Sequence, residues 1–312
     1  MTGKRVLVIG RMSMSLVMNM YKIPALGETA VDDGGVAYVP GGEGAGAAIA
    51  LAKLGADALL AGKIGADAHG QRLYKYYKDA GVNTGMIKVD LDEPTALSVT
   101  MREAEGERTL LYPGAGAKYT VDNISEAMSL SPDALYLGLG IPWNLVLNSA
   151  RLAASCGVPI FVDASPAIAD QPLESLPEVE IFSPNEEEIF TYTGIMPAGV
   201  ESSLRAALAL RKRVKAKYIV IKQGERGAFI YDGKKYFLVG AAKAGKVVDT
   251  SSVGDSFTAA MTLEYLRCGD IRTAVKYGAA AGAIAASREG SFGSIPTDAE
   301  VRDFMLKTGY GY

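Results

Sequence analysis

The stretch VVDTSSVGDSFTAA, residues 247–260, decides how the rest of the chain is interpreted. Residues 246–248 are predicted to end an apolar strand, small polar residues follow, and an apolar helical pattern covers residues 257–266. Small residues allow a tight turn, and a helix that begins there directs its unpaired N–H groups and the positive end of its dipole forward. Such a place suits a phosphate group.

Asp255 stands in this turn, where a carboxylate weakens an anion site unless it has another task. One interpretation is that Asp255 caps the helix, as aspartate often does. The other is that it takes a proton from a substrate hydroxyl while the N–H groups hold the phosphoryl group in transfer. The stretch by itself leaves both interpretations open.

The composition restricts the class of protein. With 312 residues, 49% hydrophobic and 21% charged, the chain has the size and balance of a soluble globular protein with a large core. Net charge is −3, and the one Lys/Arg-rich run, residues 211–217, ends an amphipathic helical pattern, so nucleic-acid binding has little support. Because no segment resembles a signal peptide or a membrane span, we expect a cytoplasmic protein without a membrane partner.

The number and the positions of the cysteines and the histidine make several kinds of catalytic and metal site unlikely. Cys156 and Cys268 lie far apart in apolar contexts, which predicts buried free thiols in a reducing compartment. His69 is the one histidine, so neither a histidine-based nucleophile triad nor a site of several histidines for a metal is expected.

The order of patterns predicts an α/β fold. Residues 4–10 indicate a buried parallel strand, and from residue 134 apolar strands alternate with helices. This alternation favours a doubly wound, mostly parallel sheet flanked by helices. Two strand-rich excursions interrupt it, one over residues 12–38 and one as a hairpin that turns at residues 105–107.

We expect the two excursions to pair into a small β-sheet lid. The predicted core domain consists of residues 1–11, 39–94 and 113–312, and the lid, inserted discontinuously, of residues 12–38 and 95–112.

A glycine-rich run at residues 41–46 loosely matches the G-x-G-x-x-G/A pattern of dinucleotide-binding turns. The context disagrees, because the run does not follow the first strand, Pro40 precedes it, and Lys63 stands where an acid would bind a ribose. A dinucleotide oxidoreductase is therefore a weak alternative. The run is typical either of a tight turn with close helix packing or of a hinge that faces a sugar. No P-loop pattern occurs.

Two separated signatures stand out in the sequence. The first extends from PGG at residues 40–42 to GKIGADAHG at 62–70, and the second is DTSSVGDSF at 249–257. Between them lie NEEE at 185–188 and KQGERG at 222–227. The two signatures resemble those of the ribokinase-like (PfkB) carbohydrate kinases, NEEE matches that family's N-x-x-E, and KQGERG is similar to its glycine turn before the nucleotide. The resemblance covers essentially the whole chain and implies ATP-dependent phosphorylation of a sugar-type hydroxymethyl group.

The resemblance also implies roles for residues. Asp255 would be the catalytic base, and the backbone N–H groups of Ser252, Val253 and Gly254 would form the anion hole. Asn185 and Glu188 resemble the pair that orders Mg²⁺ and its waters around the phosphates, although by themselves they also suit a helix cap with an acidic first turn. The positions that match the family's ATP contacts, besides Asn185, are Lys222, Gly224, Gly227 and Thr250. The positions that match a K⁺ site in relatives are Asp249, Ser251, Gly290 and Ser294.

The sequence departs from the family on the sugar side. Ser13 and Ser15 replace the Asn and Asp of the family's G-S-x-N-x-D, and Gly46 replaces the Asn of its G-G-K-G-x-N. Because sites that bind substrate hydroxyls discriminate through such groups, ribose specificity is not indicated. The candidate substrate-binding residues are Arg11, Ser13, Ser15, Gly41, Gly42 and Gly46.

Several acceptors and two classes of function stay open. Arg11 and Glu43 are candidates for replacement contacts, and adenosine-type nucleosides, fructose and other ketoses, or a sugar acid paired with Arg11 are all compatible. One hypothesis is a Mg²⁺-dependent ATP:sugar kinase whose lid closes over the sugar and pairs with a second lid in a homodimer. The other is a catalytically weak sugar- or nucleotide-binding protein on the same scaffold, and the intact Asp255 argues against it.

Overall fold

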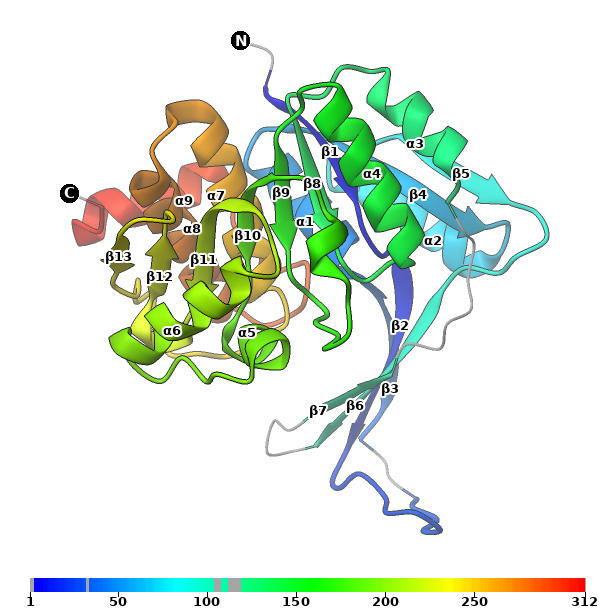
Figure 1. Ribbon diagram of the computed structural model, residues 1–312. Coiled ribbons are helices and arrows are strands. Elements are labelled where there is room, and N and C mark those ends of the chain that lie inside the picture. The colour runs from blue at the N-terminus through cyan, green and yellow to red at the C-terminus, as the bar shows by residue number, and fades with distance from the viewer. Residues whose placement is uncertain (1–2, 32–33, 104–107, 112–118, 312) are drawn as a thin grey trace.

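The computed structural model describes residues 3–31, 34–103, 108–111 and 119–311 (Figure 1). Its main body is a nine-stranded sheet with helices on both faces, and a separate four-stranded sheet projects from one end. The nine strands follow the order β13-β12-β11-β10-β9-β8-β1-β4-β5. Their bounds are β1 (Arg5–Ile9), β4 (Asp57–Gly65), β5 (Asn83–Asp90), β8 (Ala134–Gly138), β9 (Ile160–Asp163), β10 (Val179–Ser183), β11 (Ala216–Lys222), β12 (Ala228–Tyr231) and β13 (Tyr236–Val239).

The main sheet is parallel from β5 to β11, and β12 and β13 extend it as an antiparallel hairpin. Strands covered on both faces need nearly continuous apolar sequences, such as RVLVI in β1. The predicted doubly wound, mostly parallel sheet is confirmed. The carboxyl ends of the parallel strands point toward the small sheet, and that edge is where open α/β sheets bind ligands (Figure 1).

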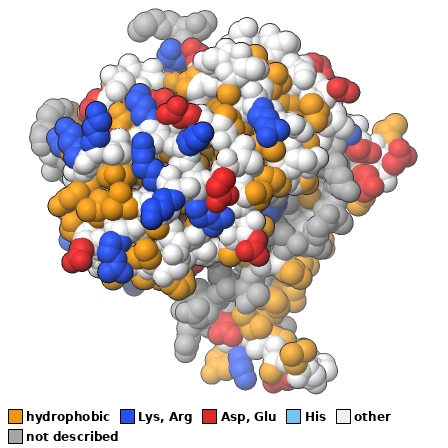
Figure 2. All heavy atoms as spheres, in the orientation of Figure 1, with side chains coloured by type: hydrophobic (Ala, Val, Ile, Leu, Met, Phe, Trp, Pro, Cys, Tyr) orange, Lys and Arg blue, Asp and Glu red, His pale blue; other side chains and the backbone are white. Residues whose placement is uncertain are grey.

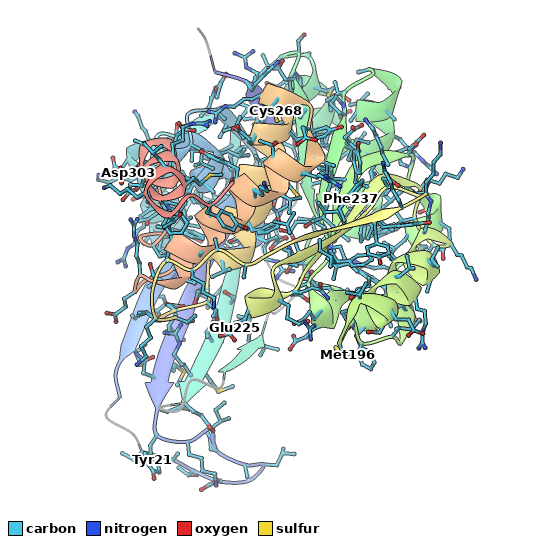
Figure 3. The ribbon with its side chains drawn as sticks, turned by 90° about the vertical axis from the view of Figure 1, so that its left-hand side faces the viewer. Tyr21, Met196, Glu225, Phe237, Cys268 and Asp303 are labelled. Atoms are coloured by element: carbon cyan, nitrogen blue, oxygen red, sulfur yellow. The ribbon has the colours of Figure 1, made fainter. Side chains whose placement is uncertain are left out.

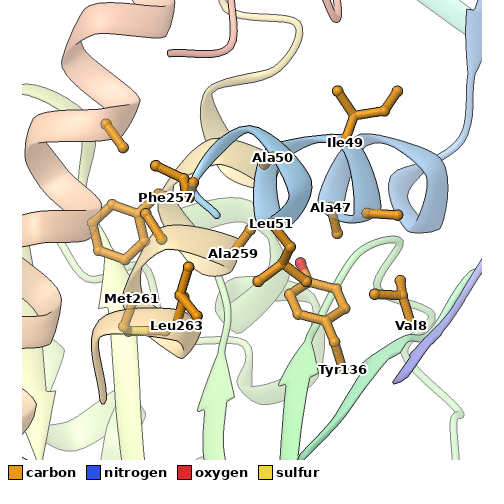
Figure 4. Packing of buried hydrophobic residues seen from close by; sticks show 14 of the residues in the cluster. Val8, Ala47, Ile49, Ala50, Leu51, Tyr136, Phe257, Ala259, Met261 and Leu263 are labelled. Carbon is orange, nitrogen blue, oxygen red and sulfur yellow. The ribbon is translucent and has the colours of Figure 1, made fainter. Parts of the chain in front are cut away.

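Helices form a layer on each face of the main sheet. Alternate residues of β1 enter different cores: Val6 and Val8 belong to the core of α1, α7 and α8, and Leu7 and Ile9 to the core of α3, α4 and α6. Figure 4 shows Val8 and Tyr136 of the sheet below α1, with α7 alongside. The helix bounds are α1 (Glu43–Lys53), α2 (Ala68–Asp79), α3 (Val121–Met128), α4 (Trp143–Ser155), α5 (Glu186–Thr193), α6 (Val200–Arg211), α7 (Val253–Cys268), α8 (Ile271–Ala286) and α9 (Asp298–Thr308).

The small sheet has the strand order β3-β2-β6-β7, so the two predicted excursions do pair with each other. Its strands are β2 (Ser13–Met20), β3 (Val36–Gly41), β6 (Leu97–Glu103) and β7 (Arg108–Leu111). The central pair, β2 with β6, is parallel, because both strands leave the core in the same direction. We call this sheet the lid. The predicted turn at residues 105–107 lies outside the described residues.

Asp67 ties the lid to the core. Its carboxylate accepts hydrogen bonds from the Gly70 N–H at 2.8 Å, which caps α2, and from the N–H and hydroxyl of Thr95, each at 2.8 Å. Thr95 is buried where the chain enters β6, and its hydroxyl oxygen also accepts the Gly65 N–H at 3.0 Å. Burial alone would raise the pKa of Asp67, but the hydrogen bonds outweigh burial and hold this pKa below its ordinary value.

Some predicted elements differ from the structure. Residues 246–248 do not form a strand, and Val247 and Val248 are more than half exposed. Strand β5 and helix α3 are not predicted at all from the sequence patterns. Among the described residues, no helix is long and apolar enough to cross a membrane.

The prediction for the two cysteines is half wrong. Both thiols are free, but both are exposed rather than buried. Cys156 caps the end of α4 and Cys268 is the last residue of α7, so each lies where its helix leaves the core. A local apolar context does not reveal that the helix ends at that residue.

The Asp67→Ala substitution is expected to lower the free energy of unfolding by about 2 kcal/mol at neutral pH, because three hydrogen bonds to a charged group disappear. Since the pKa of Asp67 is depressed in the folded state, its contribution is present above the unfolded pKa and is lost as the pH falls through the folded one. Urea unfolding at neutral and at acidic pH measures both effects.

The matched control is Asp79→Ala on the same helix, which removes only the exposed ion pair with Lys75. Its expected effect is below about 0.5 kcal/mol. Equal losses for the two variants would contradict the anchoring role of Asp67.

Candidate active site

The site is built around the N-terminus of α7. Ser252 is the N-cap residue, but its hydroxyl donates to Ser291 O at 2.7 Å and makes no capping bond within the helix. Asp255 lies in the first turn, and among the described residues its carboxylate takes part in no hydrogen bond or ion pair. The capping interpretation of Asp255 therefore finds no support in the structure. The N–H of Val253 makes only a long bond of 3.4 Å to Thr250 O.

Gly46 of α1 lies directly against Asp255. A Cβ atom placed on Gly46 would lie 2.0 Å from Asp255 Oδ2 and 2.7 Å from its Cγ, closer than side-chain atoms can come. The two helices can therefore hold the acid in this position only because residue 46 has no side chain. The lack of a side chain at Gly46 thus leaves room for the Asp255 carboxylate, and the predicted contact of Gly46 with the substrate stays a prediction.

A buried charged cluster lies beneath Asp255 at the carboxyl ends of the strands. The Lys222 ammonium of β11 lies 3.4 Å from Asp163 Oδ1 of β9 and 3.2 Å from the hydroxyl of Thr258 on α7. Asp163 is 1% exposed, and its Oδ2 accepts the Tyr136 hydroxyl at 2.9 Å. Burial raises the pKa of Asp255 well above its usual range, and the neighbouring carboxylate of Asp163 raises it further.

Arg11 and Glu43, the candidates for replacement sugar contacts, lie in contact with each other. The Arg11 backbone N–H donates to Glu43 Oε1 at 3.1 Å, and its guanidinium donates to Gly140 O from Nε at 3.0 Å and from Nη2 at 2.7 Å. Burial raises the pKa of Glu43, and the nearby Arg11 opposes this shift. A Cβ on Gly140 would lie 2.2 Å from Glu43 Oε1, so this pair needs a glycine beside it.

Ser13 and Ser15 lie where the lid joins the core. Ser13 is 1% exposed, and its hydroxyl has no hydrogen-bond partner among the described residues. The Ser15 hydroxyl lies 2.6 Å from that of Ser98 on β6, and a Cβ on Gly41 would lie 2.2 Å from it. Gly42 turns the chain from β3 into α1 with φ of 99°. Ser13, Ser15 and Gly41 therefore lie close together where the lid joins the core, and their contact with a sugar stays a prediction.

Asn185 and Glu188 form a reciprocal helix cap. The Asn185 N–H donates to Glu188 Oε2 at 2.6 Å, and the Glu188 N–H donates to Asn185 Oδ1 at 2.8 Å. Burial raises the pKa of Glu188 to about 7, and the nearby Lys222 opposes the shift. The two residues thus have the capping role that the sequence allowed, and the Mg²⁺ role stays a prediction.

The predicted nucleotide contacts occupy the turn after β11 and the loop before α7. Gly224 begins a short 3-10 turn after β11, and Gly227 ends it with φ of 87°, where a Cβ would lie 2.0 Å from Val239 O. Thr250 precedes α7, and Glu225 of the turn faces the side from which the lid projects (Figure 3). Lys222 differs from this group, because its ammonium points inward to Asp163 and Thr258.

The predicted K⁺ positions come together in two adjoining loops. Asp249 Oδ1 accepts the N–H of Ser251 at 2.8 Å and its hydroxyl at 2.6 Å, and the Ser294 hydroxyl donates to Ser291 O at 2.8 Å. Arg102 of the lid reaches this place, with Nη2 at 3.3 Å from the Ser251 hydroxyl and 4.0 Å from Asp249 Oδ2. Since these side chains are engaged, a K⁺ ion here would depend on main-chain oxygens. No group of three or more His, Cys, Asp or Glu in the described ranges is arranged to hold a metal ion.

Reasoning from the sequence missed Asp163, Gly140 and Arg102 as parts of the site. Asp163 had a signal, because a charged residue ends an apolar strand at the edge where ligands bind. Gly140 and Arg102 had none, since their contacts join residues that are 129 and 149 positions apart.

The fold and this arrangement are those of an α/β enzyme that acts on a phosphate group. The chain matches the family model described as pfkB family carbohydrate kinase over residues 4–298, and it belongs to this family. It is 27% identical over 296 residues to a ribokinase of Arabidopsis thaliana, covering 93% of this chain and 78% of that protein. It is also 27% identical to a ribokinase of Haemophilus influenzae, covering 97% and 98% of the two chains.

Solved structures show the same fold. The structure of Arabidopsis thaliana ribokinase complexed with ribose and ATP has a TM-score of 0.84 at 24% identity and covers 97% of this chain and 99% of that one. Ribokinase from Giardia lamblia has a TM-score of 0.89 at 22% identity, covering 99% and 100% of the two chains.

The Gly46→Ala substitution is expected to lower kcat by about 100-fold, because the added methyl group displaces the Asp255 carboxylate by an ångström or more. Thermal unfolding and kcat, measured together, separate this effect from misfolding. Gly240→Ala is the control, since a Cβ there meets no atom within 4 Å. A fully active Gly46→Ala variant would show that Asp255 does not act from this position.

Proposed function

We propose that this protein transfers the γ-phosphate of ATP to a primary hydroxyl of a sugar or sugar-like acceptor, with Asp255 as the general base. The observation that carries the proposal is an unpaired carboxylate in the first turn of α7, beside N–H groups that suit the phosphoryl group. The carboxylate removes the proton from the acceptor hydroxyl as the hydroxyl attacks, and the backbone N–H groups of Ser252, Val253 and Gly254 hold the transferred group.

The residues present suit a nucleotide with its cations. Glycines at positions 224 and 227 let the backbone approach phosphates and ribose, and Asn185 and Glu188 supply the hard oxygen atoms that Mg²⁺ prefers. Bound Mg²⁺ neutralises charge on the phosphates. The relatives named above support ATP as the donor. K⁺ beside Asp249 remains part of the proposal, with main-chain oxygens as its ligands.

The acceptor is proposed to be a neutral polyol. A sugar acid paired with Arg11 gains little support, because the guanidinium already donates two hydrogen bonds to Gly140 O. Ribose, ketoses such as fructose, and adenosine-type nucleosides remain acceptors to compare. A catalytically weak binding protein is disfavoured. The absence of a side chain at Gly46, which could be taken as the loss of a sugar contact, instead leaves room for the carboxylate of the proposed base.

The Asp255→Asn substitution is expected to lower kcat by about 10²- to 10⁴-fold with any acceptor, because the general base is lost while the shape of the site is retained. ADP release is measured against a panel of sugars and nucleosides. Asp303→Asn, on exposed α9, is the matched control. Retained turnover in Asp255→Asn would remove the base. Tight ligand binding in calorimetry, without phosphoryl transfer to any acceptor, would favour the binding protein.

We also propose that two chains associate through the lid. In the strand register, one lid face carries Ser15, Ser98 and Arg102 and faces the core. Most residues on the opposite face are apolar, although Glu103 and Thr109 share it; the apolar residues are Leu16, Met18, Val36, Tyr38, Val99, Met101 and Leu111. Val36 is 64% exposed and Leu111 58%, and hydrophobic side chains gather on the projecting sheet in Figure 2. An exposed apolar sheet face favours association with a second copy.

The Val99→Lys substitution, in the centre of this face, is expected to convert a dimer into a monomer, because a charge would be buried at the interface. Light scattering coupled to gel filtration measures the mass. Leu238→Lys, at a 56% exposed position on β13, is the control. A wild-type monomer, or a Val99→Lys variant that stays dimeric, would exclude the lid as the interface.

A further inference from the structure

Lys222 is a buried lysine that the phosphoryl transfer described above does not use. It is the last residue of β11, and its side chain is 11% exposed. A buried ammonium is costly unless it is paired, so its partners indicate what it does. The resemblance places this position among the nucleotide contacts, but the ammonium lies between Asp163 Oδ1 at 3.4 Å and the Thr258 hydroxyl at 3.2 Å.

These two contacts connect the sheet to the helix of the base. Asp163 ends β9 and is held in turn by the Tyr136 hydroxyl of β8. Thr258 follows Asp255 by three residues on α7, so both side chains lie on the same face of that helix. The Lys222 ammonium therefore joins the carboxyl edge of three strands to the face of α7 that carries Asp255.

The charges around Asp255 are mostly negative. Carboxyl groups face it from three other elements, namely Asp163 of β9, Glu43 of α1 and Glu188 of α5, and Lys222 of β11 is the cation among the groups that act on it most strongly. Burial raises the pKa of Asp255, the carboxylates of Asp163 and Glu43 add to the rise, and Lys222 opposes it. The phenol of Tyr136 on β8 completes the surroundings.

We propose that Lys222 is a positioning residue for the proposed kinase: its ammonium, held between Asp163 and Thr258, fixes the first turns of α7 against the sheet and places a positive charge on the side of the helix that carries Asp255. The inference rests on the proposed function, since it needs Asp255 to be the base. It assigns Lys222 a task at the acceptor side rather than at the nucleotide.

The test measures kcat of Lys222→Gln and of the wild type as a function of pH. On the acidic side kcat falls as the general base becomes protonated, and we call this part of the profile the acid limb. Lys222 opposes the rise in the pKa of Asp255, so without the cation the limb is expected to move to higher pH. The rate at neutral pH is expected to fall about 10-fold or more and to recover in part as the pH increases. The KM for ATP should change by less than about 3-fold, because the ammonium does not face the nucleotide.

Lys217→Gln is the matched control. It is the same substitution on the same strand, but Lys217 is half exposed and pairs with Glu180 on the surface. Its limb and its rate are expected to equal those of the wild type. A Lys222→Gln variant that loses rate equally at every pH, or one whose KM for ATP rises while its limb stays in place, would overturn the proposal.

Two further measurements keep the test decisive if Lys222→Gln folds poorly or if no acceptor is turned over. Thr258→Val keeps the shape and removes one partner of the ammonium, and a limb shift in the same direction is expected. A ¹³C NMR titration of aspartate carboxyl groups, with Asp255→Asn for assignment, follows the acid without turnover. An unchanged Asp255 titration in Lys222→Gln overturns the inference, whereas a shifted titration in a protein without kinase activity overturns only the proposed function.

Discussion

The close approach of α1 and α7 is the constraint on which the rest of the site depends. The two helices come from opposite ends of the chain and meet where Gly46 has no side chain, so that Asp255 occupies the space a Cβ would need. The position of Asp255, the proposed base, thus explains why residue 46 has no side chain. The loss of the family's asparagine at this position is therefore compatible with an active enzyme.

Placing a carboxylate between two helices also creates an electrostatic difficulty. Asp255 is surrounded by Asp163, Glu43 and Glu188, and burial alone favours its neutral form. A base must be ionised to accept a proton. Lys222, held between Asp163 and Thr258, supplies a compensating positive charge.

Successive side chains of the lid strands point to opposite faces of the sheet, so the two faces differ in composition and in contacts. Ser15, Ser98 and Arg102 share the face toward the core, and Arg102 reaches the loop that precedes α7. The neighbouring residues of the same strands, such as Val99 and Met101, lie on the opposite, apolar face. A single strand register thereby gives one face to the proposed closure over the substrate and the other to the proposed association of two chains. The hydrogen bonds of Asp67 fix where this sheet leaves the core.

The sequence alone determined the α/β class and the two segments of the lid, and it singled out Asp255 as the proposed base, because apolar periodicity and signature motifs are local properties. It did not predict β5 or α3, it placed a strand at residues 246–248, and it predicted that two exposed cysteines would be buried. The tertiary structure decided the surroundings of Gly46, Asp163 and Lys222. Their contacts join residues far apart in the chain, and such distances and local charges exist only once the helices and strands have packed.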